Sequence, residues 1–286
     1  MNNNQINCKA IYDRVLEQIK EDLKILPEVP TLTILAGCGG YASEMYMKLK
    51  QKTAEECGIN SRIVYLPDNV SDVYDYIEQG GFYDGELSIL QLPATKAQKE
   101  IQDMLIDYKD HIDVDNFNFL RWFYDVNTKY QSYDFFMRRL PATPKGVLEV
   151  LKQELGDFTG KKIAIIGCRS ETVGKFLHYP LTQLNATVTT YHSKSIIRDG
   201  EFETYDAVIS CVGSPRLIKQ RHFGSNRNCV CIDIGVSRVD GKTVGDFDED
   251  IREFQRFTPY VNGMGLLTRI FLMQTVAYYA IENYLS

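Results

Sequence analysis

Short apolar runs alternate with longer amphipathic segments along most of this chain. In the first third, TLTILAG, SRIVYLP and ELSILQLP have the residue types of strands, and segments with the apolar spacing of helices separate them. Beyond residue 160, the runs KKIAIIG, ATVTTYH, AVISCVG and CVCIDIG repeat the alternation. Strands that alternate with helices form parallel sheets covered by helices. The sequence therefore predicts an α/β fold.

The alternation is interrupted once, and this interruption predicts two domains. A chain of 286 residues exceeds what one hydrophobic core usually serves. An aromatic-rich segment begins near residue 117, and PATPKG at 141–146 then starts a new helix. We assign residues 144–265 to a Rossmann domain with a doubly wound parallel sheet. Residues 1–143 form the predicted N-terminal α/β domain, and 266–286 form a long helix that we expect to pack back on it.

Composition and charge exclude several classes of function. The net charge of -6 opposes binding to nucleic acid or to an anionic membrane surface. The 7 cysteines contain no CxxC pair and the 4 histidines are isolated, so we expect neither a disulfide framework nor a metal site. The N-terminus lacks the pattern of a secretory signal, and we expect no apolar run to reach the length needed to span a bilayer. We expect a cytoplasmic protein.

The segment KKIAIIGCRSETVGKF follows an apolar run and opens a helix, which is where a dinucleotide pyrophosphate binds. Its spacing is not GxGxxG, because only Gly167 and Gly174 are present, and a glycine-rich turn alone is a weak signal. Arg169 and Ser193 supply a cation and a hydroxyl for the extra phosphate of NADP, whereas NAD prefers an acid. The alternative is a sheet with solvated basic loops, and we favour the cofactor site.

The stretch YASEMYMKLK places Tyr46 and Lys50 on one face of a predicted helix. Ser43 is the expected start of this helix and Gly58 its expected end. A lysine on a helix is usually solvated, and spacing alone leaves that interpretation open for Lys50. A lysine screened from solvent has a lowered pKa and can transfer protons near neutral pH.

Segments through almost the whole chain resemble one family, the bifunctional methylenetetrahydrofolate dehydrogenase/methenyltetrahydrofolate cyclohydrolases. The most specific are NATVTTYHSKS and IDIGVSRVDGKTVGD. The other matching segments, in the family's order, include ASEMYMKLKQK, SILQLP, DVDNF, LPATPKG, RSETVGK and TPYVNGMGLLT. The resemblance implies a folate substrate bound in a cleft between two domains, NADP as cofactor, and a homodimer. It also implies oxidation of methylenetetrahydrofolate to the methenyl form and hydrolysis to formyltetrahydrofolate, in one-carbon metabolism and purine biosynthesis.

The family's functional residues can be placed on this sequence one at a time. Its tyrosine, lysine, QLP glutamine and second DVD aspartate fall on Tyr46, Lys50, Gln91 and Asp115. The implied roles are acid/base catalysis by Lys50, its positioning by Tyr46 and Gln91, and anchoring of the pterin by Asp115. The implied NADP contacts are Cys168, Arg169, Ser170, Gly174, Ser193 and Val236. The implied substrate loop contains Asn262, Gly263, Gly265 and Thr268.

Departures from the family gather around the predicted folate site. The family's proline- and glycine-rich loop is VNGMGLLT here, so Val261 and Leu266 replace prolines and Asn262 replaces a glycine. Asparagine can keep a left-handed backbone angle, whereas loss of both prolines loosens the loop. The residues after Asp115 also differ, and the aromatic segment up to Pro141 is longer than the family's.

Two alternatives to the bifunctional enzyme therefore remain open from the sequence. One is a degenerate relative that binds folate or a nucleotide without turnover, and the other is a dehydrogenase for a related substrate. Retention of all four implied catalytic residues favours an active folate enzyme. The aromatic segment can cover the folate cleft or contact a partner subunit, and its sequence favours neither.

Overall fold

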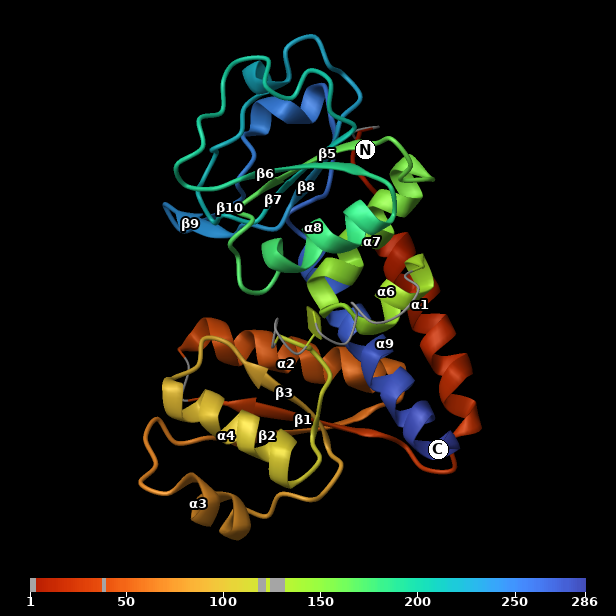
Figure 1. Ribbon diagram of the computed structural model, residues 1–286, viewed down its shortest axis with the longest axis vertical. Helices are drawn as coiled ribbons and strands as arrows, with labels where there is room; N and C mark the ends of the chain where they lie inside the picture. The colour runs from red at the N-terminus through yellow and green to blue at the C-terminus, as the bar shows by residue number, and fades with distance from the viewer. Residues whose placement is uncertain (1–3, 38–39, 118–121, 124–131) are drawn as a thin grey trace. The chain divides into compact units, whose positions relative to one another are not determined.

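The computed structural model of the protein describes residues 4–37, 40–117, 122–123 and 132–286. Much of the predicted aromatic segment, 118–121 and 124–131, lies outside the described residues. The chain forms two compact units, drawn in Figure 1. The first-sheet unit comprises Arg14–Asp115 with Arg269–Ser286, and the second-sheet unit comprises Met1–Asp13 with Asn116–Thr268.

These units have different bounds from the predicted domains. The described residues of 116–143, a range placed in the N-terminal domain from the sequence, belong by their contacts to the second-sheet unit. There the ring of Trp122 lies edge-on to that of Phe176, with centroids 5.1 Å apart, and also contacts Tyr179. The C-terminal helix from Arg269 onward belongs to the first-sheet unit, as predicted. The division of the chain by function stays a prediction.

The first-sheet unit contains a parallel sheet in the order β2-β1-β3-β4. Its strands are β1 (Thr31–Ala36), β2 (Asn60–Tyr65), β3 (Leu87–Gln91) and β4 (Ile112–Asp113). Its helices are α2 (Tyr41–Cys57), α3 (Val73–Gln79) and α4 (Lys96–Tyr108), with the 3-10 turn η1 (Leu23–Ile25) and most of α1 (Cys8–Asp22) and α9 (Met264–Leu285). In Figure 1, α2 lies on one side of this sheet, and α3 with α4 lies on the other.

Local sequence accounts for these elements. All residues of β3 are buried, as expected for a central parallel strand covered on both faces. Helix α2 ends at Gly58, whose φ of 76° is a left-handed conformation that glycine adopts without strain. The helix begins at Tyr41 rather than at the expected Ser43, because Gly40 takes the extended N-cap position. The side chains between the sheet, α3 and α4 form a core of Leu35, Leu66, Ile77, Phe82, Leu90, Ile101 and Leu105.

The second-sheet unit contains a parallel sheet in the order β11-β8-β7-β5-β6 and an antiparallel hairpin of β9 and β10. Its strands are β5 (Lys162–Ile166), β6 (Thr187–Tyr191), β7 (Ala207–Ser210), β8 (Val230–Asp233), β9 (Ser237–Val239), β10 (Lys242–Val244) and β11 (Arg256–Phe257). Its helices are α6 (Tyr133–Arg139), α7 (Ala142–Leu155) and α8 (Gly174–Gln183), with the 3-10 turns η2 (Gln220–Phe223) and η3 (Glu249–Glu253). Because β5 lies between β6 and β7, the sheet is doubly wound, as predicted.

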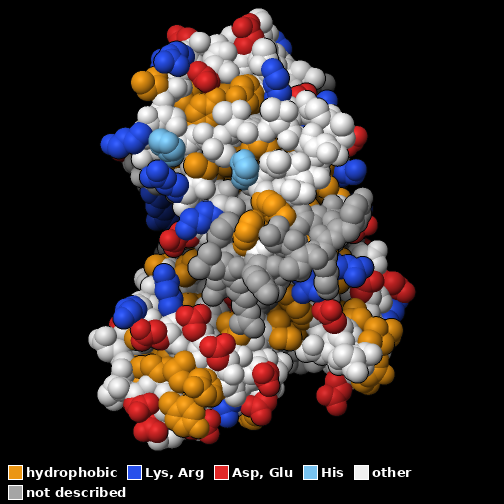
Figure 2. Space-filling view, in the orientation of Figure 1, with side chains coloured by type: hydrophobic (Ala, Val, Ile, Leu, Met, Phe, Trp, Pro, Cys, Tyr) orange, Lys and Arg blue, Asp and Glu red, His pale blue; other side chains and the backbone are white. Residues whose placement is uncertain are grey.

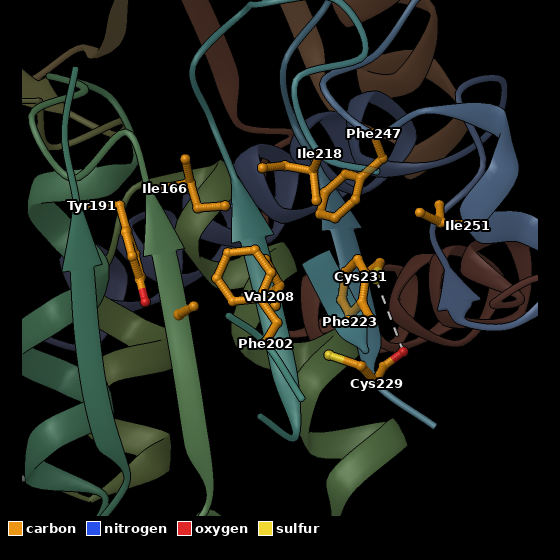
Figure 3. Close-up of a cluster of buried hydrophobic side chains, with 11 residues drawn as sticks. Ile166, Tyr191, Phe202, Val208, Ile218, Phe223, Cys229, Cys231, Phe247 and Ile251 are labelled. Atoms are coloured by element: carbon orange, nitrogen blue, oxygen red, sulfur yellow. Dashed lines mark hydrogen bonds between the residues drawn. The ribbon is translucent and has the colours of Figure 1, made fainter. Parts of the chain in front are cut away.

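A cluster of buried side chains packs against this sheet (Figure 3). The rings of Phe202 and Phe223, both fully buried, lie 5.6 Å apart at its centre. Ile166, at the end of β5, and Tyr191, at the end of β6, belong to the same cluster. Since protein interiors are close-packed, this cluster holds the carboxyl ends of neighbouring strands in a fixed relation.

Helix α9 is long and apolar enough to cross a bilayer by length and composition, so the expectation that no run reaches that length was wrong. Most of its apolar stretch is buried inside the protein, including Phe271 and Met273. Core helices of soluble proteins meet the same criterion. Packing within the protein therefore accounts for the apolar character of α9.

Candidate active site

Lys50 lies on α2, and only 5% of it is exposed. Its Nζ donates a hydrogen bond to Oε1 of Gln91 at 2.9 Å. The same Nζ lies 5.6 Å from the ring centroid of Tyr46, one helical turn earlier. Its neighbours Lys48 and Lys52 are exposed. The interpretation of Lys50 as an ordinary solvated lysine is therefore wrong, and the pair that the helical spacing predicts is formed.

Gln91 ends β3 and is 7% exposed. Its Nε2 donates a hydrogen bond to the carbonyl oxygen of Leu92 at 2.7 Å. An amide has one donor end and one acceptor end, so this second bond fixes Oε1 toward Lys50. Gln91 pairs in register with Ala36 of β1 in the centre of the sheet. The acceptor for Lys50 is thus carried by a rigid, buried strand.

Asp115 follows β4 and is also buried, with its backbone N–H donating to Oδ1 of Asp113 at 3.1 Å. Burial lowers the pKa of the Lys50 amine, and the carboxylate of Asp115 opposes this effect by raising it. Gln91 ends β3 and Asp115 follows β4, so both lie at the carboxyl ends of adjacent strands, which is where open α/β sheets place ligands. The first-sheet unit therefore brings a buried amine, an amide and a carboxylate to one edge of its sheet.

The turn after β5 has the close backbone approach that a pyrophosphate site requires. Gly167 has a φ of 90°, and a Cβ at Gly174 would lie 2.3 Å from the Gly167 carbonyl oxygen. Both positions therefore favour glycine. Helix α8 starts at Gly174, and the free N–H groups and dipole of a helix N-terminus attract phosphate.

A cavity of about 500 Å³ opens at the carboxyl ends of β5, β6 and β7. The predicted contacts Arg169, Ser170 and Ser193 line it. Its position beside β5, where the strand order reverses, is the one at which doubly wound sheets bind dinucleotides. Lys and Arg side chains gather along one edge of this unit on the face shown in Figure 2. The cavity has the position and the cationic lining expected for NADP.

Three predicted cofactor contacts lie outside this lining. Gly174 contributes through its close packing on the turn. Cys168 lies half-buried in the turn itself, and Val236, 71% exposed, follows β8. Sequence reasoning did not assign the lining residues Ile166, Gly167, Tyr191, His192, Ser195, Ile197, Cys211, Val212, Leu217, Arg221 and His222 as NADP contacts. The glycine of CVGSP, directly after β7, could have indicated that the neighbouring Val212 lines the cofactor cavity. No sequence pattern near Arg221 indicates that it does so.

The predicted substrate loop is divided between the connection from β11 to α9, which carries Asn262 and Gly263, and the start of α9 itself, which carries Gly265 and Thr268. Asn262 has a φ of 58°, so it keeps the left-handed angle expected of it. A Cβ at Gly263 would lie 1.7 Å from the carbonyl oxygen of Pro259, which makes glycine necessary there. The hydroxyls of Thr268 and Thr143 lie 2.9 Å apart. At Gly265 a Cβ would meet open space. Hydrogen bonding and close packing define this loop without the two prolines.

Comparison with known proteins decides the family. Residues 141–284 match the model of the tetrahydrofolate dehydrogenase/cyclohydrolase NAD(P)-binding domain. The chain is 32% identical over 266 residues to the bifunctional protein FolD of Macrococcus caseolyticus, covering 91% of this chain and 90% of that protein. The chain belongs to the tetrahydrofolate dehydrogenase/cyclohydrolase family. Another relative in this family, from Halothermothrix orenii, is 31% identical, with 94% of this chain and 95% of the relative covered.

Solved structures of the family share the fold. The bifunctional methylenetetrahydrofolate dehydrogenase/cyclohydrolase of Campylobacter jejuni has a TM-score of 0.79 at 27% identity, covering 98% of this chain and 99% of that one. The Trypanosoma brucei enzyme, solved with NADP and an inhibitor, has a TM-score of 0.80 at 22% identity, covering 98% of each chain. The family and the fold class predicted from the sequence are confirmed. The roles of the individual site residues stay predictions.

Proposed function

We propose that the protein oxidises methylenetetrahydrofolate to methenyltetrahydrofolate with NADP and hydrolyses the product to formyltetrahydrofolate. The observation that carries the proposal is the buried amine of Lys50, 2.9 Å from Gln91 Oε1 and 5.6 Å from the Tyr46 ring centroid. An amine in such surroundings has a pKa shifted toward neutrality and can both accept and donate a proton. Membership of the family supports folate as the substrate.

Hydrolysis needs a proton removed from the water that adds to the methenyl carbon, and a proton delivered to the nitrogen that leaves it. We assign both transfers to Lys50. Gln91 holds the amine through its fixed carbonyl oxygen, and Tyr46 supplies a ring face beside it. Asp115, with two acceptor oxygens, matches the paired N–H donors of a pterin ring. These residues bind and orient the folate while a single amine moves the protons.

NADP, when bound, accepts a hydride from the methylene carbon, a step that needs contact and orientation rather than an acid or base. Gly167 and Gly174 leave room for the pyrophosphate at the start of α8. Arg169 and Ser193 line the cavity and offer a cation and a hydroxyl to the extra phosphate. Ser170 forms part of the wall of the proposed NADP site. Cys168 would contact NADP from the turn after β5, and Val236 from the loop after β8.

We further propose a homodimer in the cytoplasm, without nucleic-acid or membrane partners. The net charge of -6 and the burial of most of the apolar stretch of α9 support this setting. Residues 1–143 with 266–286 then act as the folate-binding part and 144–265 as the dinucleotide-binding part. Light scattering on the purified protein measures the mass of the assembly, and a monomer at assay concentration would contradict the dimer.

A direct assay tests the proposed activities. Purified protein with methylenetetrahydrofolate and NADP should produce the methenyl absorbance, and added methenyltetrahydrofolate should lose it faster than in buffer alone. Parallel reactions with NAD measure the cofactor preference. Calorimetry that detects folate and NADP binding without any turnover would contradict the proposal and favour a degenerate relative.

A further inference from the structure

The segment IDIGVSRVDGKTVGD ends in Asp246, a fully buried carboxylate that the proposed chemistry does not use. This carboxylate accepts hydrogen bonds from the last residue of β7 and from the segment that follows it. Oδ2 accepts from Ser210 Oγ at 2.7 Å and from the backbone N–H groups of Val212 and Gly213 at 2.9 and 3.2 Å. Oδ1 accepts from the backbone N–H of Ser214 at 2.7 Å. Asp246 therefore fixes three successive peptide groups with a single side chain.

The segment that Asp246 holds is also a wall of the cofactor cavity. Cys211 and Val212 line the cavity. A Cβ at Gly167 would lie 3.0 Å from the Cys211 carbonyl oxygen and 3.1 Å from Cγ2 of Val212, so the wall touches the phosphate-binding turn. Within the 212–214 segment Val212 lines the cavity, so a displacement of its backbone changes the cavity directly.

Asp246 is itself held in place from several directions. Its backbone N–H donates to Oδ1 of Asp233 at 3.1 Å, and its carbonyl oxygen accepts from Ile218 at 2.9 Å. A Cβ at Gly235 would lie 2.1 Å from Oδ1 of Asp246, and a Cβ at Gly245 would lie 2.0 Å from Oδ2 of Asp233. The two glycines therefore provide the space that the two carboxylates occupy.

The side of the cavity that this wall faces follows from the sheet topology. In a doubly wound sheet the two halves of a dinucleotide lie on opposite sides of the strand that carries the phosphate turn. Ser193, beyond β6, marks the adenosine side through the extra phosphate proposed for it. The 212–214 segment follows β7, on the opposite side of β5, and so borders the nicotinamide half.

We propose that Asp246 is a positioning residue for NADP, which sets the backbone of 212–214 against the nicotinamide half of the cofactor. The inference rests on the proposed use of NADP. It assigns a role to the part of the family-specific segment that the catalytic residues leave unexplained. Removing the acceptor carboxylate should weaken cofactor binding and leave the folate chemistry of Lys50 intact.

The test compares Asp246→Asn with wild type in the full-length protein. Asparagine keeps the size but replaces one acceptor oxygen by a donor, so bonds from 212–214 are lost. We expect the Kd and the KM for NADP to rise about tenfold to a hundredfold, the range for losing hydrogen bonds to a charged group. Hydrolysis of added methenyltetrahydrofolate without NADP should stay within about twofold of wild type, as a measure of correct folding. Asp240→Asn, at an exposed left-handed turn position between β9 and β10, is the matched control.

The outcomes separate the inference from the proposed function. Wild-type NADP affinity in Asp246→Asn, or an equal loss of cofactor binding and cofactor-free hydrolysis, would overturn the positioning role. If wild type binds NADP but does not turn over folate, the proposed function fails while the calorimetric comparison still tests Asp246. Should Asp246→Asn not fold, Ser210→Ala removes only the hydroxyl donor, and an unchanged NADP Kd in that variant counts against the inference.

Discussion

Gln91 presents its carbonyl oxygen to Lys50 at 2.9 Å because its amide nitrogen is already bound to the carbonyl of Leu92. A neutral acceptor in this position holds the amine without adding a negative charge beside it. Gln91→Glu would add that charge at nearly the same size. The added carboxylate should raise the pKa of Lys50, so that less free amine exists near neutral pH.

We therefore expect Gln91→Glu to slow hydrolysis at neutral pH and to move the ascending limb of the pH–rate profile to higher pH. Stopped-flow loss of the methenyl absorbance across the pH range measures both effects. Gln51→Glu, at a half-buried position of α2 that lines a different cavity, serves as the control for added charge. If the ascending limb of the pH–rate profile does not move in Gln91→Glu, the Lys50 amine does not control the rate of hydrolysis.

Lys50→Met should abolish most of the hydrolysis. Methionine fills the space of the lysine stem but transfers no proton, and general acid/base catalysis typically contributes a factor of about 10² to 10⁴. Binding of NADP should be unchanged, because the cofactor cavity is built from other residues. Lys48→Met, an exposed lysine on the same helix, is the matched control. Hydrolysis at the wild-type rate in Lys50→Met would remove this amine from the mechanism.

Asp115→Asn should act on Lys50 in the opposite direction from Gln91→Glu. The carboxylate of Asp115 raises the pKa of the amine against the larger effect of burial, so its removal should lower that pKa further. The ascending limb of hydrolysis should move to lower pH, and the KM for folate should rise because a charged acceptor for the pterin is lost. Asp110→Asn, at an exposed left-handed position, is the control. A profile that moves to higher pH would contradict the assigned interaction.

Arg169→Ala tests the source of the NADP preference. Loss of a hydrogen-bonding cation for the extra phosphate should raise the KM for NADP about tenfold to a hundredfold. The KM for NAD, which lacks that phosphate, should change little. Arg238→Ala, exposed on β9, removes an equal charge from the same unit. Parallel increases for both cofactors would mean that Arg169 shapes the turn instead of selecting the phosphate.

Stability should depend on pH through Asp233. Burial raises the pKa of its carboxyl to about 7, with the nearby Asp246 acting in the same direction and backbone N–H groups of Phe247 and Asp246 opposing. An unfolded aspartate titrates near a pKa of about 3.9. Between these values the folded protein binds the extra proton, so the free energy of unfolding should fall as pH rises from about 4 to about 7. Tyr260 also faces this carboxyl, with Arg252 beside it.

Urea unfolding of wild type and Asp233→Asn at pH 5 and pH 8 measures this contribution. The variant has no carboxyl at this position, so its stability should change less between the two pH values. Asp240→Asn again controls for loss of an exposed carboxylate nearby. An identical pH dependence in wild type and Asp233→Asn would assign the titration to other groups.

The strands were predictable from the sequence because buried parallel strands consist of nearly continuous apolar residues, as in KIAII and AVIS. Tyr46 and Lys50 were predictable as a pair because helical spacing places them on one face. The burial of Lys50, by contrast, depends on β3 and on the segment after β4, which are distant in sequence. Local periodicity carries no information on such contacts.

The parts that sequence reasoning missed share this dependence on distant contacts. Arg221 reaches the cofactor cavity from η2, far along the chain from the phosphate turn. The aromatic residues after Asp115 showed no clear period, and the grouping of the described ones with the second-sheet unit follows from ring contacts such as Trp122 with Phe176. The early start of α2 was missed because a glycine N-cap is a weaker signal than serine.

The mutual fit of Gly235 with Asp246, and of Gly245 with Asp233, limits how this segment can evolve. A methyl group at Gly235 would overlap a carboxylate oxygen of Asp246, and a methyl group at Gly245 would overlap one of Asp233. Replacing either aspartate by a smaller residue would make that room, but would also release the peptide groups that the carboxylate binds. Within each pair, a substitution of the glycine or of the aspartate is therefore disfavoured, whichever comes first. Descendants of this protein should retain all four residues together.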